Sequence, residues 1–316
     1  MAIKSLKPVG RMALMAASTV MLVPVYAPAA EAPAKLDYVV TAAQIAQAAK
    51  DLAAKADKSG GVLTQAPLIT VAPFTVALDY RKAPSRDVHA DLTGGEFMIV
   101  LGGTGAITLG GTLIDPKRQG DDLHAQRRTG GQAYELDPGA EILVPEGMAH
   151  AITRVDGALT MITVHLPHPS APAATISGAA RAFISGADLA QTADDAAAKN
   201  SATTVLTPLL TEGPFNNHME YRIGGSSNVH AHPTEAEMLV VLQGSGDFKL
   251  DGKMVDPTFS DGALHAEKTI GSQVFHASQG DIVLVPPGVP HTVLPVTGRF
   301  VLISTHFPKP AATADK

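Results

Sequence analysis

Short apolar runs separated by glycine and proline recur along most of the chain. The segments "EILVPEG" (141–147) and "DIVLVPPG" (281–288) are typical of buried strands that end at a turn. In "AITLGGTLI" (106–114) and "FKLDGKMV" (248–255), two apolar stretches flank Gly-Gly and Asp-Gly, residues that favour a two-residue hairpin turn. Many short strands with this punctuation predict an all-β fold, either a sandwich or a jelly-roll barrel.

Two alanine-rich stretches differ from this β pattern. They are "TAAQIAQAAKDLAAKA" (41–56) and "SGADLAQTADDAAAKN" (185–200), and each opens with a hydroxyl residue, Thr41 or Ser185, that can cap a helix. Each stretch precedes one β-rich half of the chain. The sequence therefore predicts two barrels or sandwiches in tandem, each preceded by a short α-helix.

The two halves are related by an internal duplication. The segment "VHADLTGGEFMIVLGGTG" (88–105) matches "VHAHPTEAEMLVVLQGSG" (229–246), and the offset is 141 residues, from 89 to 230. The same offset joins Tyr80 to Tyr221, Arg81 to Arg222, Glu96 to Glu237, His124 to His265, His150 to His291 and His165 to His306. An unbroken offset over so many positions indicates a repeated structural unit.

The second copy carries a set of side chains with metal-ligand chemistry. His230 and His232 are alternate residues of a predicted strand, so their imidazoles point to the same side. After the turn "PTEA", Glu237 begins the next strand, so that one hairpin would supply three ligands. His291 would be the fourth, presented by a tight turn at Gly288. Three histidines and a carboxylate suit zinc, copper, iron, nickel or manganese, with one or two positions left open.

These residues resemble the two sequence motifs of the cupin superfamily. The first motif is matched by Gly224, His230, His232, Glu237 and Gly244, and the second by Gly280, Pro286, Gly288 and His291. Pro295 stands where the family often has an asparagine. The resemblance covers roughly residues 60–308 as a duplicated, bicupin arrangement. It implies two tandem jelly-roll β-barrels with metal at the centre, and activities that range from dioxygenases, decarboxylases, isomerases and lyases to non-catalytic binders.

The first copy departs from the motif at one ligand. His89, Glu96 and His150 match the second copy, but Asp91 replaces the second histidine. Two histidines and two carboxylates can bind a metal of harder character, which makes these four residues a candidate second metal site. The alternative is a scaffold barrel whose site has decayed.

The beginning of the chain predicts export. Three basic residues precede the apolar stretch "MALMAASTVMLV", which is followed by small residues, and this order is typical of a cleaved signal peptide. The predicted organisation is a signal peptide at 1–30, an N-terminal barrel with the degenerate motif at 31–170, and a C-terminal barrel with the intact motif at 171–316. The expected location is periplasmic or secreted.

Composition narrows the range of partners. The chain has no cysteine, which excludes disulfides, thiolate catalysis and iron–sulfur clusters. Its formal charge of −6 becomes more negative once the three basic residues of the signal peptide are removed, and aromatic residues are only 4%. An acidic chain with few aromatics is a poor candidate for nucleic acid or anionic membranes. A small-molecule substrate is therefore the expected partner, and homo-oligomerisation is left open.

The leading functional hypothesis is a metal-dependent enzyme that acts on a small oxygen-rich molecule in the C-terminal barrel. Glu237 is predicted to take part in catalysis, by leaving the metal or accepting a proton. Tyr221, Arg222 and His265 are candidate substrate contacts. A dioxygenase-type oxidoreductase is favoured because that chemistry is common among bicupins with this ligand set. The alternatives are an isomerase, lyase or decarboxylase acting on a small sugar acid or keto acid, and a non-catalytic metal-binding or ligand-binding protein.

Overall fold

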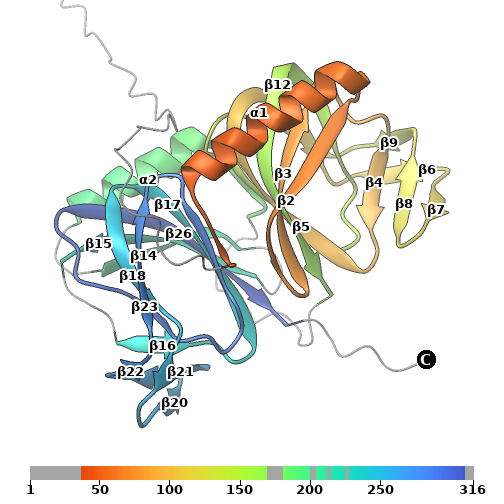
Figure 1. Cartoon of the computed structure of the whole chain (residues 1–316). Helices are drawn as coiled ribbons and strands as arrows, with labels where there is room; N and C mark the ends of the chain where they lie inside the picture. The colour runs from red at the N-terminus through yellow and green to blue at the C-terminus, as the bar shows by residue number, and fades with distance from the viewer. Residues whose placement is uncertain (1–36, 169–180, 200–203, 212–214, 225–227, 310–316) are drawn as a thin grey trace, which may run out of the picture.

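The computed structural model describes residues 37–168, 181–199, 204–211, 215–224 and 228–309. The described part is mostly β, with two helices, and forms two barrels side by side (Figure 1). The predicted all-β fold of two tandem barrels, each preceded by a short helix, is confirmed. The predicted signal peptide (1–30) and the predicted boundary at 170 lie outside the described residues.

Both predicted helices are present and begin at the predicted caps. Helix α1 spans Ala42–Ser59, and the Thr41 hydroxyl accepts a hydrogen bond from the Gln44 backbone amide, while the Gln44 side chain accepts one from the Thr41 amide. Helix α2 spans Gly186–Ala198, and the Ser185 hydroxyl likewise accepts a hydrogen bond from a backbone amide of its first turn. These caps satisfy amides that have no partner inside the helix. Neither helix is both long and apolar enough to cross a membrane.

The N-terminal barrel is built around two long strands that pair with each other over most of their length, β5 (Gly94–Leu109) and β12 (His150–Pro167). The other strands of this barrel are β2 (Leu63–Val71), β3 (Phe74–Arg81), β4 (Val88–Asp91), β6 (Thr112–Ile114), β7 (Lys117–Gln119), β8 (Asp122–Ala125), β9 (Arg127–Thr129), β10 (Gln132–Leu136) and β11 (Glu141–Val144). Because β5 and β12 bend, one continuous sheet wraps around the barrel interior.

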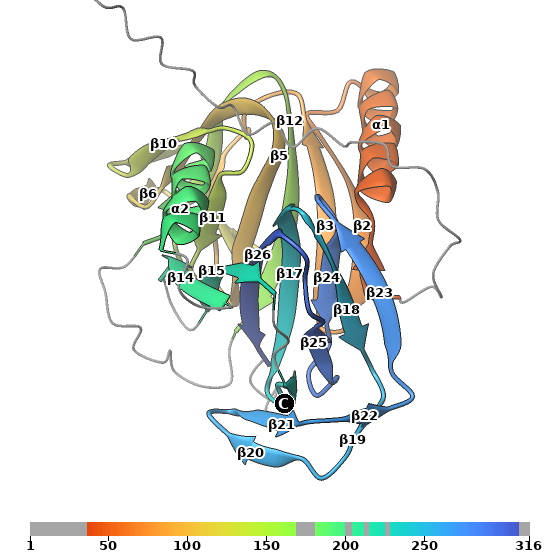
Figure 2. The ribbon, with the colours of Figure 1, turned by 90° about the vertical axis from the view of Figure 1, so that its left-hand side faces the viewer.

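The C-terminal barrel consists of two separate sheets, because the counterpart of β5 is broken at Gly244 into β17 (Glu235–Gln243) and β18 (Ser245–Leu250). The remaining strands are β14 (Thr204–Leu210), β15 (Asn216–Ile223), β16 (Val229–Ala231), β19 (Lys253–Met254), β20 (Thr258–Ser260), β21 (Ala263–Ala266), β22 (Thr269–Ile270), β23 (Gln273–Ser278), β24 (Ile282–Val285), β25 (His291–Val293) and β26 (Arg299–Pro308). Strands β19 to β22 extend beyond the barrel at one end (Figure 2).

The predicted hairpins are wrong, although the predicted turn residues are correct. Asp251 and Gly252 both have positive φ, as do Gly110 and Gly111. However, β18 pairs with β23 and β25, whereas β19 pairs only with β22, so the Asp-Gly turn is a corner that takes the chain out of the barrel sheet. Likewise β16 and β17 lie in different sheets, so the turn between them crosses the barrel and is not a hairpin.

The first short strand of each half pairs with the opposite barrel. Strand β1 (Val39–Val40) is antiparallel to β24, whereas β13 (Phe183–Ile184) is antiparallel to β11. The first backbone amide of each following helix is also hydrogen-bonded to a residue of the opposite barrel. The Ala42 amide donates to Asp281 at 2.8 Å, and the Gly186 amide donates to Asp137 at 3.0 Å. The two barrels therefore exchange their leading strands.

A continuous apolar layer joins the barrels. In β17, Leu239 and Val241 face the interior of the C-terminal barrel, whereas Met238 and Val240 face this layer. Phe307 lies 5.6 Å and 6.2 Å from the rings of Phe74 and Phe97, measured between ring centroids. Because strands such as β24 are buried on both faces, the sequence shows an unbroken apolar run there and not an alternation.

Candidate metal centres

Four predicted ligands meet inside the C-terminal barrel. His230 lies on β16, directly opposite His291 on β25, while Glu237 reaches in from β17 in the facing sheet. His232 follows β16 and completes the group. One ligand atom from each of the four lies within 4.8 Å of the others. The structure thus brings together all four residues of the predicted C-terminal metal site.

Glu237 occupies the middle of this group. Its Oε2 lies 2.7 Å from His291 Nε2, 3.6 Å from His232 Nε2 and 4.0 Å from His230 Nε2. The side chains of Glu237 and His291 are only 4% and 3% exposed, whereas His230 and His232 are 22% and 17% exposed. The two histidines of the first motif therefore form the side of the centre that faces solvent.

The two motif segments are held together by a backbone hydrogen bond. The Gly288 amide donates to the His232 carbonyl at 2.8 Å, and in the other barrel the Gly147 amide donates to the Asp91 carbonyl at 2.6 Å. Gly288 has φ of 82°, a conformation that costs little only for glycine. This contact fixes the turn that presents His291 to the residues of the first motif.

Further hydrogen bonds orient the ligands. The Ser304 hydroxyl donates to Glu237 Oε1 at 2.7 Å, which leaves Oε2 facing the histidines. His291 Nδ1 is 3.0 Å from the Val289 carbonyl and can donate to it, so Nε2, which faces Glu237 Oε2, is the nitrogen that would bind a metal. On the other side of His232, His306 lies 3.1 Å from Glu235 and 3.8 Å from Glu237.

The electrostatic environment keeps the four clustered side chains in protonation states that favour binding of a cation. Burial, together with the neighbouring imidazoles, lowers the pKa of His230 to about 3 and that of His232 to about 4, although Glu237 acts in the opposite direction. Both rings are therefore neutral and keep a lone pair. Burial disfavours the charged form of Glu237, but His306 and His291 hold its pKa well below the ordinary value. The carboxylate is consequently ionised.

The predicted second set also comes together, in the N-terminal barrel. His89 and Asp91 lie on β4, Glu96 on β5 and His150 at the start of β12, and these four again offer ligand atoms within 4.8 Å of one another. His150 Nε2 is 3.2 Å from Glu96 Oε2, and the rings of His89 and His150 have centroids 4.0 Å apart. The degenerate motif has thus kept the geometry of a ligand cluster.

In the N-terminal cluster, the polar side chains are less well compensated by neighbouring groups than in the C-terminal cluster. Burial lowers the pKa of His89 to about 4, and burial together with Asp122 raises the pKa of Asp91 to about 6. Asp91 Oδ2 is enclosed without a hydrogen-bond partner, and the enclosed His150 Nε2 has only the ion pair with Glu96, without good hydrogen-bond geometry. Buried polar atoms without partners are costly, and a cation between them would satisfy both.

Both clusters fit a divalent transition metal. Atoms that bind one ion at ~2.1 Å lie at most ~4.2 Å apart, so the described spacing needs only a small contraction. The C-terminal set would hold the metal through His230, His232, Glu237 and His291, with three nitrogen donors that late transition metals prefer. The N-terminal set has two nitrogen and two oxygen donors.

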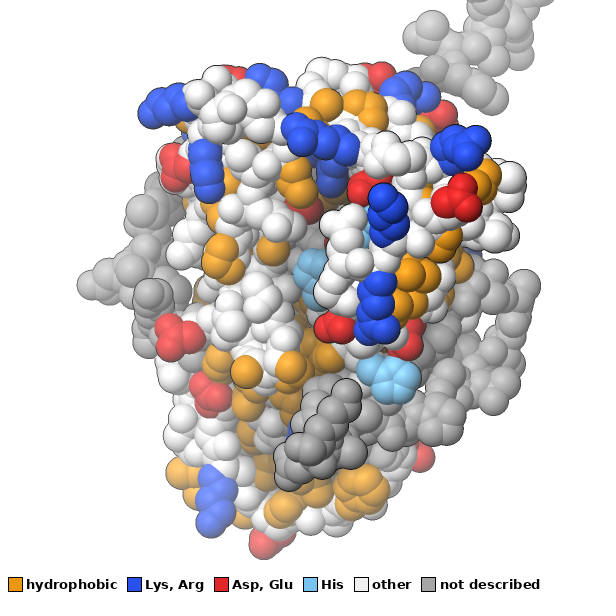
Figure 3. Space-filling view, turned by 90° about the vertical axis from the view of Figure 1, so that its right-hand side faces the viewer, with side chains coloured by type: hydrophobic (Ala, Val, Ile, Leu, Met, Phe, Trp, Pro, Cys, Tyr) orange, Lys and Arg blue, Asp and Glu red, His pale blue; other side chains and the backbone are white. Residues whose placement is uncertain are grey.

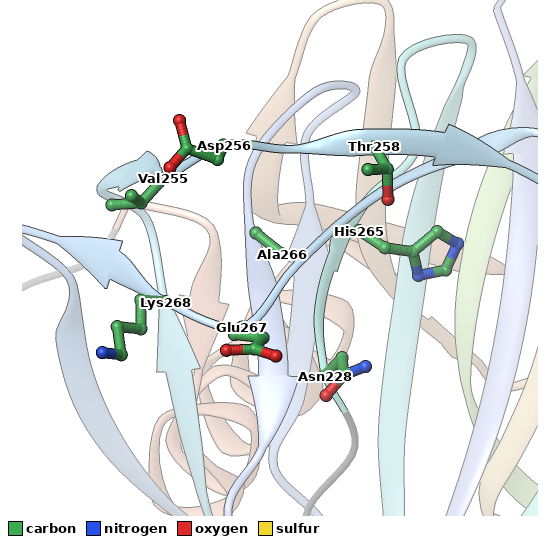
Figure 4. A pocket seen from close by; sticks show the side chains of 8 residues that line it. All are labelled: Asn228, Val255, Asp256, Thr258, His265, Ala266, Glu267 and Lys268. Atoms are coloured by element: carbon green, nitrogen blue, oxygen red, sulfur yellow. The ribbon is translucent and has the colours of Figure 1, made fainter.

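The predicted substrate contacts occupy three different environments. Tyr221 is buried in the layer between the barrels, with the Arg299 guanidinium over its ring. Arg222 lines the small cavity beside the C-terminal centre and is ion-paired with Glu220 at 2.6 Å. His265 lies opposite His230 in the strand register and lines a separate groove of about 500 Å³ beside β19 to β22. In Figure 4 the His265 ring points away from Glu267 and Lys268.

Some residues of the C-terminal site were not predicted. Ser304 was missed because a lone serine in an apolar strand has no motif. Glu220 was missed although it is the counterpart of Asp79 at the same offset of 141 residues, a signal that could have found it. Ser304 acts on Glu237 from the neighbouring strand β26, so only the strand register reveals it, whereas Glu220 pairs with Arg222 two residues further along β15.

Comparisons with known proteins agree with this architecture. The family model for the cupin domain matches residues 190–311. A salicylate 1,2-dioxygenase from Pseudaminobacter salicylatoxidans superposes with a TM-score of 0.57, at 11% identity, over 90% of this chain and 89% of that one. Residues 190–311, the C-terminal barrel with its preceding helix, therefore match the cupin family. Because the superposition covers both barrels, the two-barrel architecture of this chain resembles that of the dioxygenase.

Two further solved structures also resemble this chain. A point mutant of the same dioxygenase, in complex with gentisate, gives a TM-score of 0.56 at 11% identity, covering 88% of this chain and 84% of that one. A deletion mutant of the Bacillus subtilis oxalate decarboxylase gives a TM-score of 0.41 at 12% identity, covering 76% of this chain and 70% of that one. A search of curated proteins found no match.

Proposed function

We propose that this protein is a metal-dependent cupin enzyme whose reaction takes place at the C-terminal centre, and that it is a dioxygenase-type oxidoreductase acting on a small oxygen-rich molecule. The observation that carries the proposal is the convergence of three imidazoles on one ionised carboxylate inside the barrel. A bound divalent metal supplies Lewis acidity and, in the case of iron, copper or manganese, redox chemistry. The similarity in fold to the salicylate 1,2-dioxygenase supports the dioxygenase direction.

The protein's own groups position the substrate and hold a proton. Glu237 can accept a proton from a substrate hydroxyl at Oε2, because its Oε1 is held by Ser304. His230 and His232 lie on the side that solvent reaches, where a substrate would enter. The apolar side chains of Leu239, Phe248 and Val293 line the cavity and exclude water around the carboxylate.

A second candidate is a non-catalytic metal-binding protein. The cavity beside the C-terminal centre measures only about 10 Å³. A single water molecule already needs ~10–15 Å³. Part of that cavity is lined by Arg222 and Glu220, which are paired to each other. A centre with little room for a substrate favours metal binding alone.

The location and the metal are parts of the same proposal. A chain exported by the general secretion route would fold in the periplasm and bind the metals present there. Nitrogen-rich sites favour copper and zinc by intrinsic affinity. We therefore expect zinc or copper in protein isolated from the periplasm, whichever metal supports activity best, as measured by elemental analysis. Protein that contains only manganese would contradict this route of loading.

Oxygen consumption tests the proposed activity. Protein reconstituted separately with iron, copper, manganese, nickel and zinc would be incubated with enediols, catechols, hydroxybenzoates and flavonols. A dioxygenase consumes one molecule of oxygen for each substrate molecule, and His232→Ala abolishes that consumption. Turnover of keto acids or uronates without oxygen would identify an isomerase, lyase or decarboxylase in place of the dioxygenase. Stoichiometric metal binding with no turnover of any compound would establish the second candidate.

A further inference from the structure

The cavity beside the N-terminal ligand cluster is larger than the cavity beside the C-terminal centre. Its volume is about 170 Å³, compared with about 10 Å³ beside the C-terminal centre. An engineered protein cavity of ~150 Å³ binds benzene, so this space accommodates a molecule with about one six-membered ring. His89, Glu96 and His150 line one part of it. The cavity therefore adjoins the second cluster of metal ligands.

The remaining wall combines apolar side chains with an arginine. The apolar part consists of Leu63, Met98, Ile107, Ile152 and Met161. Arg81 on β3 lies opposite Leu63 on β2, and Asp79 lies opposite Gln65, so this row of side chains faces the cavity. A pocket of mainly apolar residues with a few convergent polar groups is typical of a small-molecule site.

Arg81 has no carboxylate partner among the described residues. Its Nη1 donates a weak hydrogen bond of 3.4 Å to Ser85, and its Nε is enclosed without a partner. Asp79 Oδ1, on the same strand, is enclosed and unpartnered as well. Asp79 and Glu96 attract the guanidinium from a distance, but neither forms an ion pair with it, so its donors remain available to a ligand of opposite charge.

In the C-terminal barrel, the arginine that corresponds to Arg81 is paired with a carboxylate. There Arg222 pairs with Glu220, at 2.6 Å from Nη2 and 2.8 Å from Nε, both to the same carboxylate oxygen. Glu220 occupies the position of Asp79 and is one methylene longer, which lets it reach the guanidinium. The shorter aspartate leaves Arg81 available, and the larger cavity lies beside it.

We propose that the N-terminal barrel is a binding site for a small carboxylic acid, with its carboxylate on Arg81 and an apolar body of about one ring against Met98 and Met161. Arginine is suited to this role because its planar fork of donors matches a carboxylate. The open acceptor of Asp79 favours a ligand that also carries a hydroxyl group. The face of this barrel shows histidine atoms in a recess, with lysine and arginine side chains nearby (Figure 3).

The carboxylates near the cavity oppose an acidic ligand unless a cation is bound beside them. Asp91 and Glu96 belong to the candidate metal cluster, where a divalent cation would offset their two charges. The site is therefore expected to bind its ligand in protein supplied with Zn²⁺. This inference goes beyond the proposed function, since it concerns the other barrel and a binding event that needs no turnover.

Isothermal titration calorimetry with 3-hydroxybenzoate tests the proposal, using full-length protein equilibrated with Zn²⁺. The neutral analogue 3-hydroxybenzamide serves as the matched ligand. Arg81→Gln is expected to weaken binding of the acid about tenfold or more, whereas the matched variant Arg222→Gln, in the other barrel, leaves it within about twofold. The amide is expected to bind wild-type protein about as weakly as the acid binds Arg81→Gln.

Leu63→Trp provides a test that does not depend on the arginine. Leu63 is 37% exposed and lines the cavity, so a tryptophan there can block the space without disturbing the core. It is expected to weaken 3-hydroxybenzoate binding about tenfold while the unfolding temperature stays unchanged. The proposal is overturned if wild-type protein does not bind the acid at about 10 mM, if acid and amide bind equally, or if Arg222→Gln weakens binding as much as Arg81→Gln. Loss of oxygen consumption at the C-terminal centre would leave these outcomes unaffected.

Discussion

Glu141 of the N-terminal barrel accepts a hydrogen bond of 3.0 Å from the side-chain amide of Asn217 in the C-terminal barrel. Asn217 also donates to the Thr305 hydroxyl at 2.9 Å, and the other oxygen of Glu141 is enclosed without a partner. Glu141 is completely buried, and burial raises its pKa to about 8, although Asn217 acts against this shift. At neutral pH the two barrels therefore meet around an uncharged carboxylic acid.

This buried acid predicts a pH-dependent stability. Between the ordinary pKa of a glutamate and a pKa near 8, the unfolded state releases the proton that the folded state keeps, so stability falls as pH rises through this window. The free energy of unfolding is expected to decrease by ~3 kcal/mol between pH 5 and pH 8 on account of this residue. Urea denaturation of metal-free protein at several pH values measures it.

Glu141→Gln is the matched variant, because glutamine has nearly the shape of the protonated acid and does not titrate. We expect its stability to exceed that of the wild type at pH 8 and to be similar at pH 5. If wild type and variant show the same pH profile, Glu141 is already ionised in the folded protein and the described environment is wrong.

Exchanging the one ligand that differs between the barrels tests the asymmetry of the metal centres. His232→Ala is expected to lower zinc affinity of the C-terminal centre about 100-fold or more, because it removes a nitrogen donor, and to leave the β-rich circular dichroism spectrum intact. Asp91→Ala is expected to change activity little. Asp91→His gives the N-terminal set the donors of the C-terminal one and should raise its affinity for zinc or copper.

Zinc titrations of all three variants, together with oxygen consumption, check this prediction. An Asp91→Ala protein as inactive as His232→Ala would mean that the N-terminal cluster is the working centre, and that the assignment of activity to the C-terminal barrel is wrong.

The sequence predicted which residues gather into the two clusters, because their positions follow from local geometry. His230 and His232 share a face through strand alternation, and the glycine of the second motif has the positive φ that its turn requires. The pairing of strands was not predictable in this way. Asp251-Gly252 looks the same whether the chain reverses in a hairpin or turns a corner, and only the partners of β18 and β19 distinguish these cases. The availability of Arg81 depends on Asp79 being one methylene shorter than its counterpart Glu220. No sequence motif indicates this difference.

Ser304→Ala tests how far a neighbouring strand orients the carboxylate ligand. The serine is fully buried and donates to Glu237, so its loss frees that carboxylate to rotate. Metal affinity at the C-terminal centre is expected to fall ~10–100-fold, the usual effect of removing a hydrogen bond to a metal ligand. Thr163→Ala, at the equivalent position of the other barrel, is the control and should leave this affinity unchanged. Equal affinity of wild type and Ser304→Ala would show that the histidines alone fix Glu237.

Asp281→Ala tests how much the exchange of leading strands between the barrels contributes to stability. Asp281 accepts from the Ala42 amide at the start of α1 and from the Ser278 amide, both at 2.8 Å, and it is buried. Its removal is expected to cost ~1–3 kcal/mol in the free energy of unfolding, measured by urea denaturation. Thr41→Ala, which removes only the cap inside the helix's own half, should cost ~1 kcal/mol. A smaller loss for Asp281→Ala than for Thr41→Ala would mean that the contact between barrels adds little.

The exchange of leading strands also sets the order in which the two barrels can close. Val40 pairs with Ile282, so β1 waits for a partner about 240 residues further along the chain. Ile184, in contrast, pairs with Glu141, which lies only about 40 residues earlier. The N-terminal barrel can gain its edge strand before most of the C-terminal half has emerged, but the C-terminal barrel receives its edge from residues far ahead of it in the chain. A truncated product that ends before β24 leaves Val39 and Val40 without their partner strand, so only a chain that includes β24 closes both edges.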